Sequence, residues 1–221
     1  MIQVPGLISL GLMAAIVFLM GANSKKFTRQ YANFGIYCLV IFLYELILVI
    51  TSFLRIENHF IANVNSLVYL PLAFFLVCQV YLSFYQKNRS IRIIQAIIVA
   101  FTMIAWIVEN FFIGSIFIFN SRLPGFSSVL LALSCIYIIN ILIFTKSGQF
   151  LKDPDVLIVV GLLTRSITFG FTLWFLNFDY GFDFKFYSNL LVSINIGLCI
   201  SDLFFLYAVQ RILIPAGRKE Y

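Results

Sequence analysis

The chain has 221 residues, of which 62% are hydrophobic and 11% are charged. Soluble domains carry about 45–50% apolar and about 25% charged residues, so this composition excludes a soluble globular domain and a disordered chain. The formal net charge is +6, but the cations lie in short loops between apolar runs, where they set membrane orientation. We therefore expect an integral membrane protein in contact with the lipid bilayer and no nucleic-acid partner.

Seven apolar stretches are long enough to cross a membrane. About 20 residues at a rise of 1.5 Å each span a hydrocarbon core of about 30 Å. Backbone groups cannot stay unpaired in lipid, so each stretch is expected to be a helix. The stretches are residues 5–22, 33–54, 61–84, 91–112, 126–145, 156–177 and 187–210. The prediction is an all-α, polytopic membrane protein in which residues 1–221 form one seven-helix transmembrane domain.

The first stretch differs from a cleavable signal peptide. No positively charged residue precedes its apolar run, and no clean small-x-small cleavage site precedes Ser24. A secretory signal carries both features. We therefore expect residues 5–22 to be retained as the first transmembrane helix.

Lysine and arginine are distributed unequally between the two sets of loops. One set, together with the C-terminal tail, holds eleven: Lys25, Lys26, Arg29, Lys87, Arg89, Arg92, Lys146, Lys152, Arg211, Arg218 and Lys219. The other set holds three: Arg55, Arg122 and Lys185. Short cytosolic loops are enriched in Lys and Arg, so the N-terminus is predicted outside and the C-terminus in the cytosol. The Ile- and Phe-rich composition favours a bacterial inner membrane, with an organellar membrane as the alternative.

Three charged residues are predicted to meet inside the bilayer. Counted from the cytosolic helix ends at 1.5 Å per residue, Arg165 lies roughly 13 Å deep, Asp202 roughly 12 Å and Glu45 roughly 18 Å. Charged residues in spanning helices usually have a partner, so we predict that Arg165 pairs with Asp202, with Glu45 as second partner or competitor. This cluster either only fixes helix packing, because a buried arginine needs anions, or it is a switch or ligand-anion site whose pairing changes between states.

A second polar set is predicted nearer the outer face. Gln95, Thr102 and Glu109 are spaced by seven residues, which is two helical turns, and therefore form one column on a helix. With Asn65 and Tyr69, Glu109 is predicted to line an outward-facing polar cavity. The alternative is hydrogen bonding between helices, worth about 0.6 kcal/mol per pair.

Small residues recur at intervals of four in the last stretch, at Ser193, Gly197 and Ser201. Small side chains at this spacing let a second helix backbone approach closely. We interpret them as a helix-packing face. The same face suits either packing within the chain or a homo-oligomer, and the sequence leaves both open.

No motif indicates an enzyme, a metal site or a cofactor. A Gly-rich phosphate loop, HExxH and G-x-S-x-G are all absent, so no catalytic residue is expected. His59 is the only histidine, and no CxxC pair accompanies it, which leaves too few ligands for zinc or haem. Microbial rhodopsins share the predicted topology, but the seventh stretch lacks a lysine that could bind retinal.

These features favour a receptor-like sensor or a membrane subunit that signals through a separate protein partner at its basic cytosolic face. The loops are too short to form a catalytic domain of their own. The alternative is a transporter of a small solute or of protons that uses Glu109 and the Arg165 cluster along its path. A transporter needs access to the cluster from both sides of the membrane, whereas a sensor needs one open side.

Overall fold

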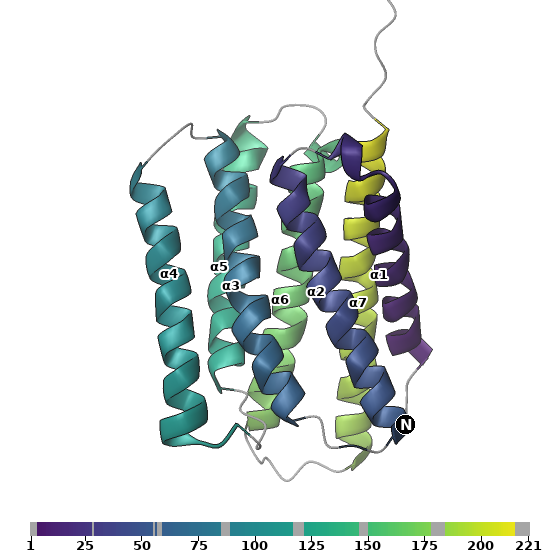
Figure 1. The fold of residues 1–221 in the computed structure, drawn as a ribbon, viewed down its shortest axis with the longest axis vertical. Helices are drawn as coiled ribbons and strands as arrows, with labels where there is room; N and C mark the ends of the chain where they lie inside the picture. The colour runs from purple at the N-terminus through teal and green to yellow at the C-terminus, as the bar shows by residue number, and fades with distance from the viewer. Residues whose placement is uncertain are drawn as a thin grey trace, which may run out of the picture.

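Each of the seven apolar stretches forms an α-helix in the computed structural model, and the helices run alternately up and down (Figure 1). The structure describes residues 4–27, 29–54, 56, 59–84, 89–116, 122–145, 150–177 and 184–214. Within these ranges there is no strand. The all-helical prediction is confirmed for this part of the chain.

The long helices begin one to four residues before the apolar stretches that predicted them. They are α1 (Val4–Ala22), α2 (Arg29–Leu54), α3 (His59–Phe84), α4 (Arg89–Val108), α5 (Arg122–Thr145), α6 (Pro154–Asn177) and α7 (Phe184–Leu213). Three short segments accompany them: the 3-10 turns η1 (Ser24–Lys26) and η3 (Phe150–Lys152), and the π-helical turn η2 (Glu109–Ile113). Hydropathy marks the hydrocarbon layer, whereas backbone hydrogen bonding continues into the polar interface.

Among the residues that the structure describes, six spans are long and apolar enough to cross a membrane, and they lie in α1, α2, α3, α4 with η2, α5 and α7. All seven long helices also expose large apolar side chains, for example Phe18 of α1, Phe53 of α2 and Phe144 of α5. Soluble monomers rarely expose such extensive apolar surface. Length, composition and surface therefore agree on a multi-pass membrane protein.

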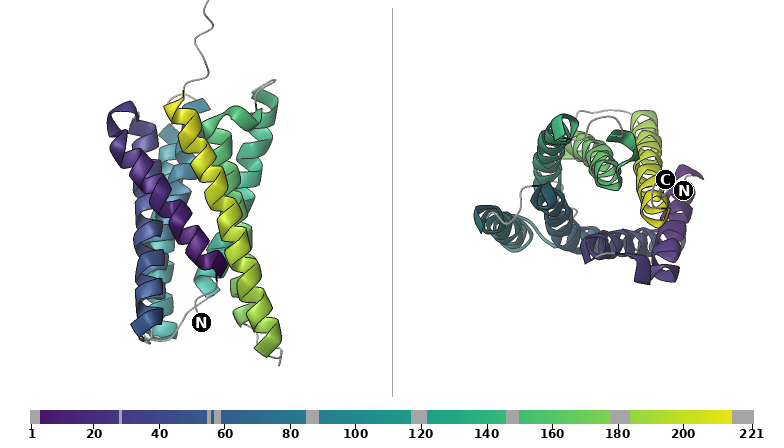
Figure 2. Two further views of the ribbon diagram at one scale, coloured as in Figure 1. Left: turned by 90° about the vertical axis from the view of Figure 1, so that its right-hand side faces the viewer. Right: turned by 90° about the horizontal axis from the view of Figure 1, so that it is seen from above.

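The first and last helices lie side by side, and α6 lies between α5 and α7 (Figure 2). Seen from above, α4 stands at the edge of the bundle, where it packs mainly against α3. The described apolar core is built by the other six helices, and α4 adds only the partly buried Ile98. Large, completely enclosed side chains such as Met13, Phe34, Leu162 and Phe205 fill the space between these six helices.

Basic residues gather at one end of the bundle. Because the helices alternate in direction, η1, η3 and the last turn of α7 meet at this end (Figure 1), and they carry Lys25, Lys26, Lys152 and Arg211. We call it the basic end. There the Arg211 Nε donates a hydrogen bond to the Lys152 carbonyl at 3.2 Å, which joins α7 to η3.

Glycines allow α6 and α7 to approach closely. A Cβ atom at Gly161 of α6 would clash with the Phe205 ring of α7, and one at Gly197 of α7 would clash with Thr168 of α6. The Ser201 hydroxyl donates a hydrogen bond to the Gly161 carbonyl at 2.9 Å. This contact holds the middle of α6, where Arg165 lies, directly against α7.

The predicted small-residue face is divided by the structure. Gly197 and Ser201 lie at the contact between α6 and α7. Ser193 is exposed, and its hydroxyl donates to the Asn189 carbonyl within α7 at 3.0 Å. Two of the three positions therefore pack helices within the chain, while the third lies on the outer surface.

Replacing Gly161 by alanine should destabilise the bundle, because the added methyl group has to displace the Phe205 ring. Overpacking of this kind costs about 1–3 kcal/mol, so the midpoint of thermal unfolding in detergent should fall. Gly11→Ala is the matched control, since nothing lies within 4 Å of a Cβ at Gly11. Equal midpoints for the two variants would contradict the close α6–α7 contact.

Candidate functional site

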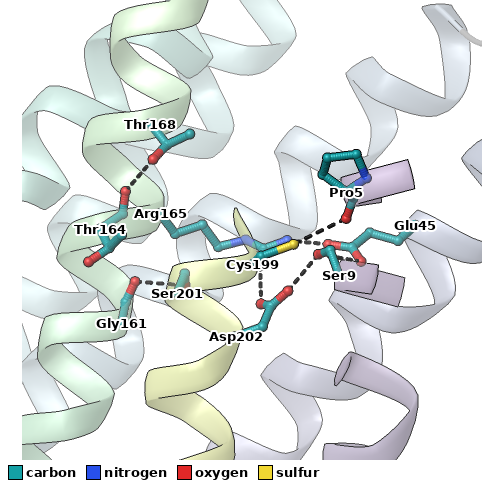
Figure 3. Close-up of polar contacts among 10 residues, drawn as sticks. All are labelled: Pro5, Ser9, Glu45, Gly161, Thr164, Arg165, Thr168, Cys199, Ser201 and Asp202. Carbon is teal, nitrogen blue, oxygen red and sulfur yellow. Dashed lines mark hydrogen bonds and ion pairs between the residues drawn. The ribbon is translucent and has the colours of Figure 1, made fainter. Parts of the chain in front are cut away.

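Arg165 lies near the middle of α6 and is 2% exposed. Its guanidinium extends past α7 toward α2 (Figure 3). Ionised side chains are rarely enclosed in this way unless partners compensate for the lost solvation. The partners of Arg165 therefore define the site.

The guanidinium uses two of its nitrogens to bind two different carboxylates. Nη1 lies 2.9 Å from Oδ1 of Asp202 on α7, and Nη2 lies 2.5 Å from Oε1 of Glu45 on α2. Asp202 is completely buried and Glu45 is 12% exposed on its side chain. The structure thus brings together the three residues that were grouped from their depths in the sequence, and the cluster joins α2, α6 and α7.

Ser9 of α1 is a fourth member, which the sequence reasoning missed. Its Oγ lies 2.5 Å from Oδ2 of Asp202 and 3.3 Å from Oε2 of Glu45, so it stands between the two carboxylates (Figure 3). It is 2% exposed. A lone serine in an apolar helix is a weak signal, because such a hydroxyl more often bonds its own backbone. Ser9 can be assigned to the cluster only from the structure, in which α1 packs beside α7.

Three buried polar atoms lie beside the cluster: Nε of Arg165 has no hydrogen-bond partner among the described residues, and the hydroxyls of Tyr37 and Tyr69 have none other than each other. The two tyrosine rings lie 5.8 Å apart between centroids. Phe169 stands next to them, with its ring centroid 5.8 Å from Cζ of Arg165. Buried polar atoms are normally satisfied, so these three mark a place where hydrogen-bonding capacity is free.

A cavity of about 70 Å³ borders this place. It is lined by Ile41, Tyr44, Asn65, Ser66, Tyr69, Leu70, Pro124, Ser128, Arg165 and Phe169. Pro124 and Ser128 belong to the first two turns of α5, so the cavity occupies the half of the bundle away from the basic end. Since a single water needs roughly 10–15 Å³ of such space, the cavity has room for several waters or a small polar group.

The predicted polar cavity and the predicted polar column are two separate features. Asn65 and Tyr69 line the cavity beside Arg165, but Thr102 and Glu109 are not among the lining residues. The Thr102 hydroxyl donates to the Ile98 carbonyl of its own helix at 2.8 Å. The side chain of Gln95 lies outside the described part of the chain. The reason for the separation is the position of α4 at the edge of the bundle (Figure 2).

Glu109 has a local structural partner. Its carboxylate oxygens accept the Leu123 backbone N–H, in the first turn of α5, at 3.1 and 3.2 Å. A carboxylate is stabilised at a helix N-terminus, where backbone N–H groups are unpaired. This bond fixes the start of η2 against the start of α5.

Trp106 links the peripheral α4 to the cavity wall. Its Nε1–H donates to the Asn63 carbonyl at 2.7 Å and lies 3.1 Å from the hydroxyl of Ser66, which lines the cavity. These contacts are buried. Trp106 therefore supports the cavity wall from behind.

No group of three potential metal ligands occurs within the described residues. No protein-family model, no curated protein and no solved structure matches the chain. The function therefore has to be argued from the geometry of the cluster and the cavity.

Replacing Arg165 by glutamine should destabilise the protein strongly, because it leaves two buried carboxylates unpaired. Removing one partner of a buried ion pair costs about 3–5 kcal/mol. The midpoint of thermal unfolding in detergent measures the loss. Lys152→Gln, at an exposed position on η3, is the control and should leave the midpoint unchanged.

The triple variant Arg165→Gln, Asp202→Asn, Glu45→Gln keeps the side-chain sizes and removes all three charges. It should recover part of the stability lost in the single variant. An unchanged midpoint for Arg165→Gln alone would contradict the role of the cluster.

Proposed function

We propose that the protein is a receptor-like sensor with seven transmembrane helices that binds a small ligand in the cavity and acts through a separate protein partner. One observation carries the proposal: among the described residues, the cavity of about 70 Å³ reaches Arg165 from the half opposite the basic end, whereas the pocket at the basic end holds only about 10 Å³ and does not include Arg165. Apart from that small pocket, the basic-end half is packed mainly with apolar core side chains, including Leu157, Leu162 and Phe205. A sensor requires that a ligand can reach Arg165 from one side of the membrane and not from the other.

The distribution of basic residues supports a cytosolic location for the basic end. Among the described helices and turns, seven Lys or Arg positions fall at this end: Lys25, Lys26, Arg29, Arg89, Arg92, Lys152 and Arg211. Arg122 and Lys185 fall at the opposite end. By the positive-inside rule the cavity then opens away from the cytosol, as in a receptor of a bacterial inner membrane. In this orientation α6 spans the membrane together with the other six helices.

The ligand is a small molecule that carries a hydrogen-bond acceptor. Nε of Arg165 supplies a donor without a partner among the described residues, and Tyr69, Asn65 and Ser128 add polar side chains to the cavity lining. The remaining lining is largely aliphatic and aromatic. Such a combination of an apolar wall with a few polar groups is typical of small-molecule sites.

The signal passes through the helices that the cluster joins. A ligand that bonds Arg165 changes how the guanidinium is shared between Glu45 on α2 and Asp202 on α7. Both helices continue to the basic end, where Arg211 of α7 bonds the Lys152 carbonyl. A shift of α7 relative to α6 therefore changes the surface that a cytosolic partner meets.

Transport of a small solute or of protons is the second candidate. It is favoured by the presence of two carboxylates around a single guanidinium, because intramembrane carboxylates often carry protons or cations along a path. The filled half of the bundle would then have to open in another state. Access from the two sides of the membrane separates the two functions.

We expect a stoichiometric cytosolic partner to co-purify with the chain in mild detergent from its native host, as identified by mass spectrometry. Lys25→Gln with Lys26→Gln, at exposed positions on η1, should reduce its recovery, because the partner is proposed to bind the basic end. Arg122→Gln at the opposite end is the control and should retain the partner. Recovery of the chain alone or only with itself would contradict action through a partner.

A cysteine placed at Ser128 reports on access to the cavity. Ser128→Cys should react with a charged, membrane-impermeant thiol reagent added on the side opposite the basic end, and not with reagent added on the basic side. Ala208→Cys, fully buried in α7, should stay unreactive from both sides, and the unsubstituted chain sets the background of the native cysteines. Reaction of Ser128→Cys from both sides would favour transport over sensing.

A further inference from the structure

The buried cluster contains one negative charge too many when all its groups are ionised. Two carboxylates, Glu45 and Asp202, share the single guanidinium of Arg165. The other titratable groups that face them are Tyr37, Cys38 and Tyr44 on α2, Tyr69 on α3 and Cys199 on α7. None of these is a cation, so the described surroundings hold no second positive charge.

An uncompensated charge inside a membrane costs several kcal/mol. One added proton makes the cluster neutral overall, since one carboxylate then balances Arg165 and the other is a neutral acid. The serine between the carboxylates indicates where this proton lies.

Ser9 has one hydroxyl proton but stands near two carboxylate oxygens. At 2.5 Å from Oδ2 of Asp202, the Ser9 hydroxyl donates its proton there, as expected of a short, charge-assisted bond. The Ser9 hydroxyl also lies 3.3 Å from Oε2 of Glu45, but its one proton makes a full hydrogen bond to only one carboxylate, so a proton on the other carboxylate would complete the second bond. The second oxygen of Glu45, Oε1, is already occupied by Arg165.

We infer that Glu45, Ser9 and Asp202 form a proton-binding site that holds one exchangeable proton, which passes between the two carboxylates through the Ser9 hydroxyl. The Oε2–H bond of Glu45 breaks as a new O–H bond forms on Oγ of Ser9, while the original Ser9 proton moves to Oδ2 of Asp202. Glu45 ends ionised, Asp202 ends neutral and the total charge is unchanged. The inference goes beyond ligand sensing and does not depend on it.

Glu45 is the group through which the proton exchanges with the surroundings. Its side chain is 12% exposed, whereas that of Asp202 is completely buried. The position of the proton also changes the contacts between helices. With the proton on Glu45, Arg165 forms its full ion pair with Asp202 of α7, and with the proton on Asp202 the ion pair lies with Glu45 of α2. Proton transfer therefore shifts the electrostatic link of α6 from one neighbouring helix to the other.

Infrared spectroscopy of the full chain in lipid at neutral pH tests this site. We expect the C=O stretch of a protonated carboxylic acid, with a shift on exchange into D₂O. Glu45→Gln and Asp202→Asn should each abolish the band, because a single carboxylate then matches a single guanidinium. Glu45→Gln keeps the size of the side chain and suffices by itself where Asp202→Asn fails to fold.

Two further variants make the result specific. Ser9→Ala should retain the band but change its frequency, because the protonated carboxylate then loses its hydrogen bond to the Ser9 hydroxyl. Glu109→Gln is the matched control for a buried carboxylate outside the cluster and should retain the band with the same exchange. Absence of the band in the unsubstituted chain, its persistence in Glu45→Gln, or its loss in Glu109→Gln would each overturn the inference.

Discussion

The guanidinium of Arg165 in the middle of an apolar bundle is the constraint on which the arrangement of the other helices depends. A cation buried at this depth has to be compensated by anions that reach it without bringing water along. Glu45 supplies one carboxylate from α2 and Asp202 supplies the other from α7. Ser9 brings α1 to the same point. The first two and the last two long helices of the chain are thereby joined at one place, and the glycine contact between α6 and α7 makes the short distances geometrically accessible.

The cluster also divides the bundle into two unlike halves. Toward the basic end large apolar side chains occupy most of the space between the helices, and the pocket described there holds only about 10 Å³, which gives that half nearly the close packing of a protein interior. Toward the other end the packing leaves a cavity that ends on Arg165. The peripheral α4 takes little part in the core, but its Trp106 supports the cavity wall through Asn63 and Ser66. A tightly packed half beside a half that contains a cavity is suited to converting a change of ion pairing at Arg165 into a relative movement of helices.

The proposed sensing role and the proposed proton site meet at Arg165. Both operate by changing which carboxylate balances the guanidinium, and therefore which neighbour, α2 or α7, is held more tightly to α6. A ligand in the cavity is proposed to act on Nε of Arg165, which has no partner among the described residues. The proton acts on the far side of the same guanidinium, through Ser9. Two inputs that act on one shared group are thermodynamically coupled, so a ligand that favours one pairing also changes the affinity for the proton.

The sequence by itself determined the helices and the depth of the charged residues. Hydropathy gives the helices because lipid forces backbone bonds inside each segment, and a rise of 1.5 Å per residue places Glu45, Arg165 and Asp202 at similar levels. Only the tertiary structure decided lateral position. Depth says nothing about which helices are neighbours, so Ser9 was missed, and Thr102 and Glu109 were placed with Asn65 and Tyr69 although α4 stands at the edge of the bundle. Lateral neighbours depend on the packing of whole helix faces, and in an apolar chain the face that meets a helix and the face that meets lipid are chemically alike.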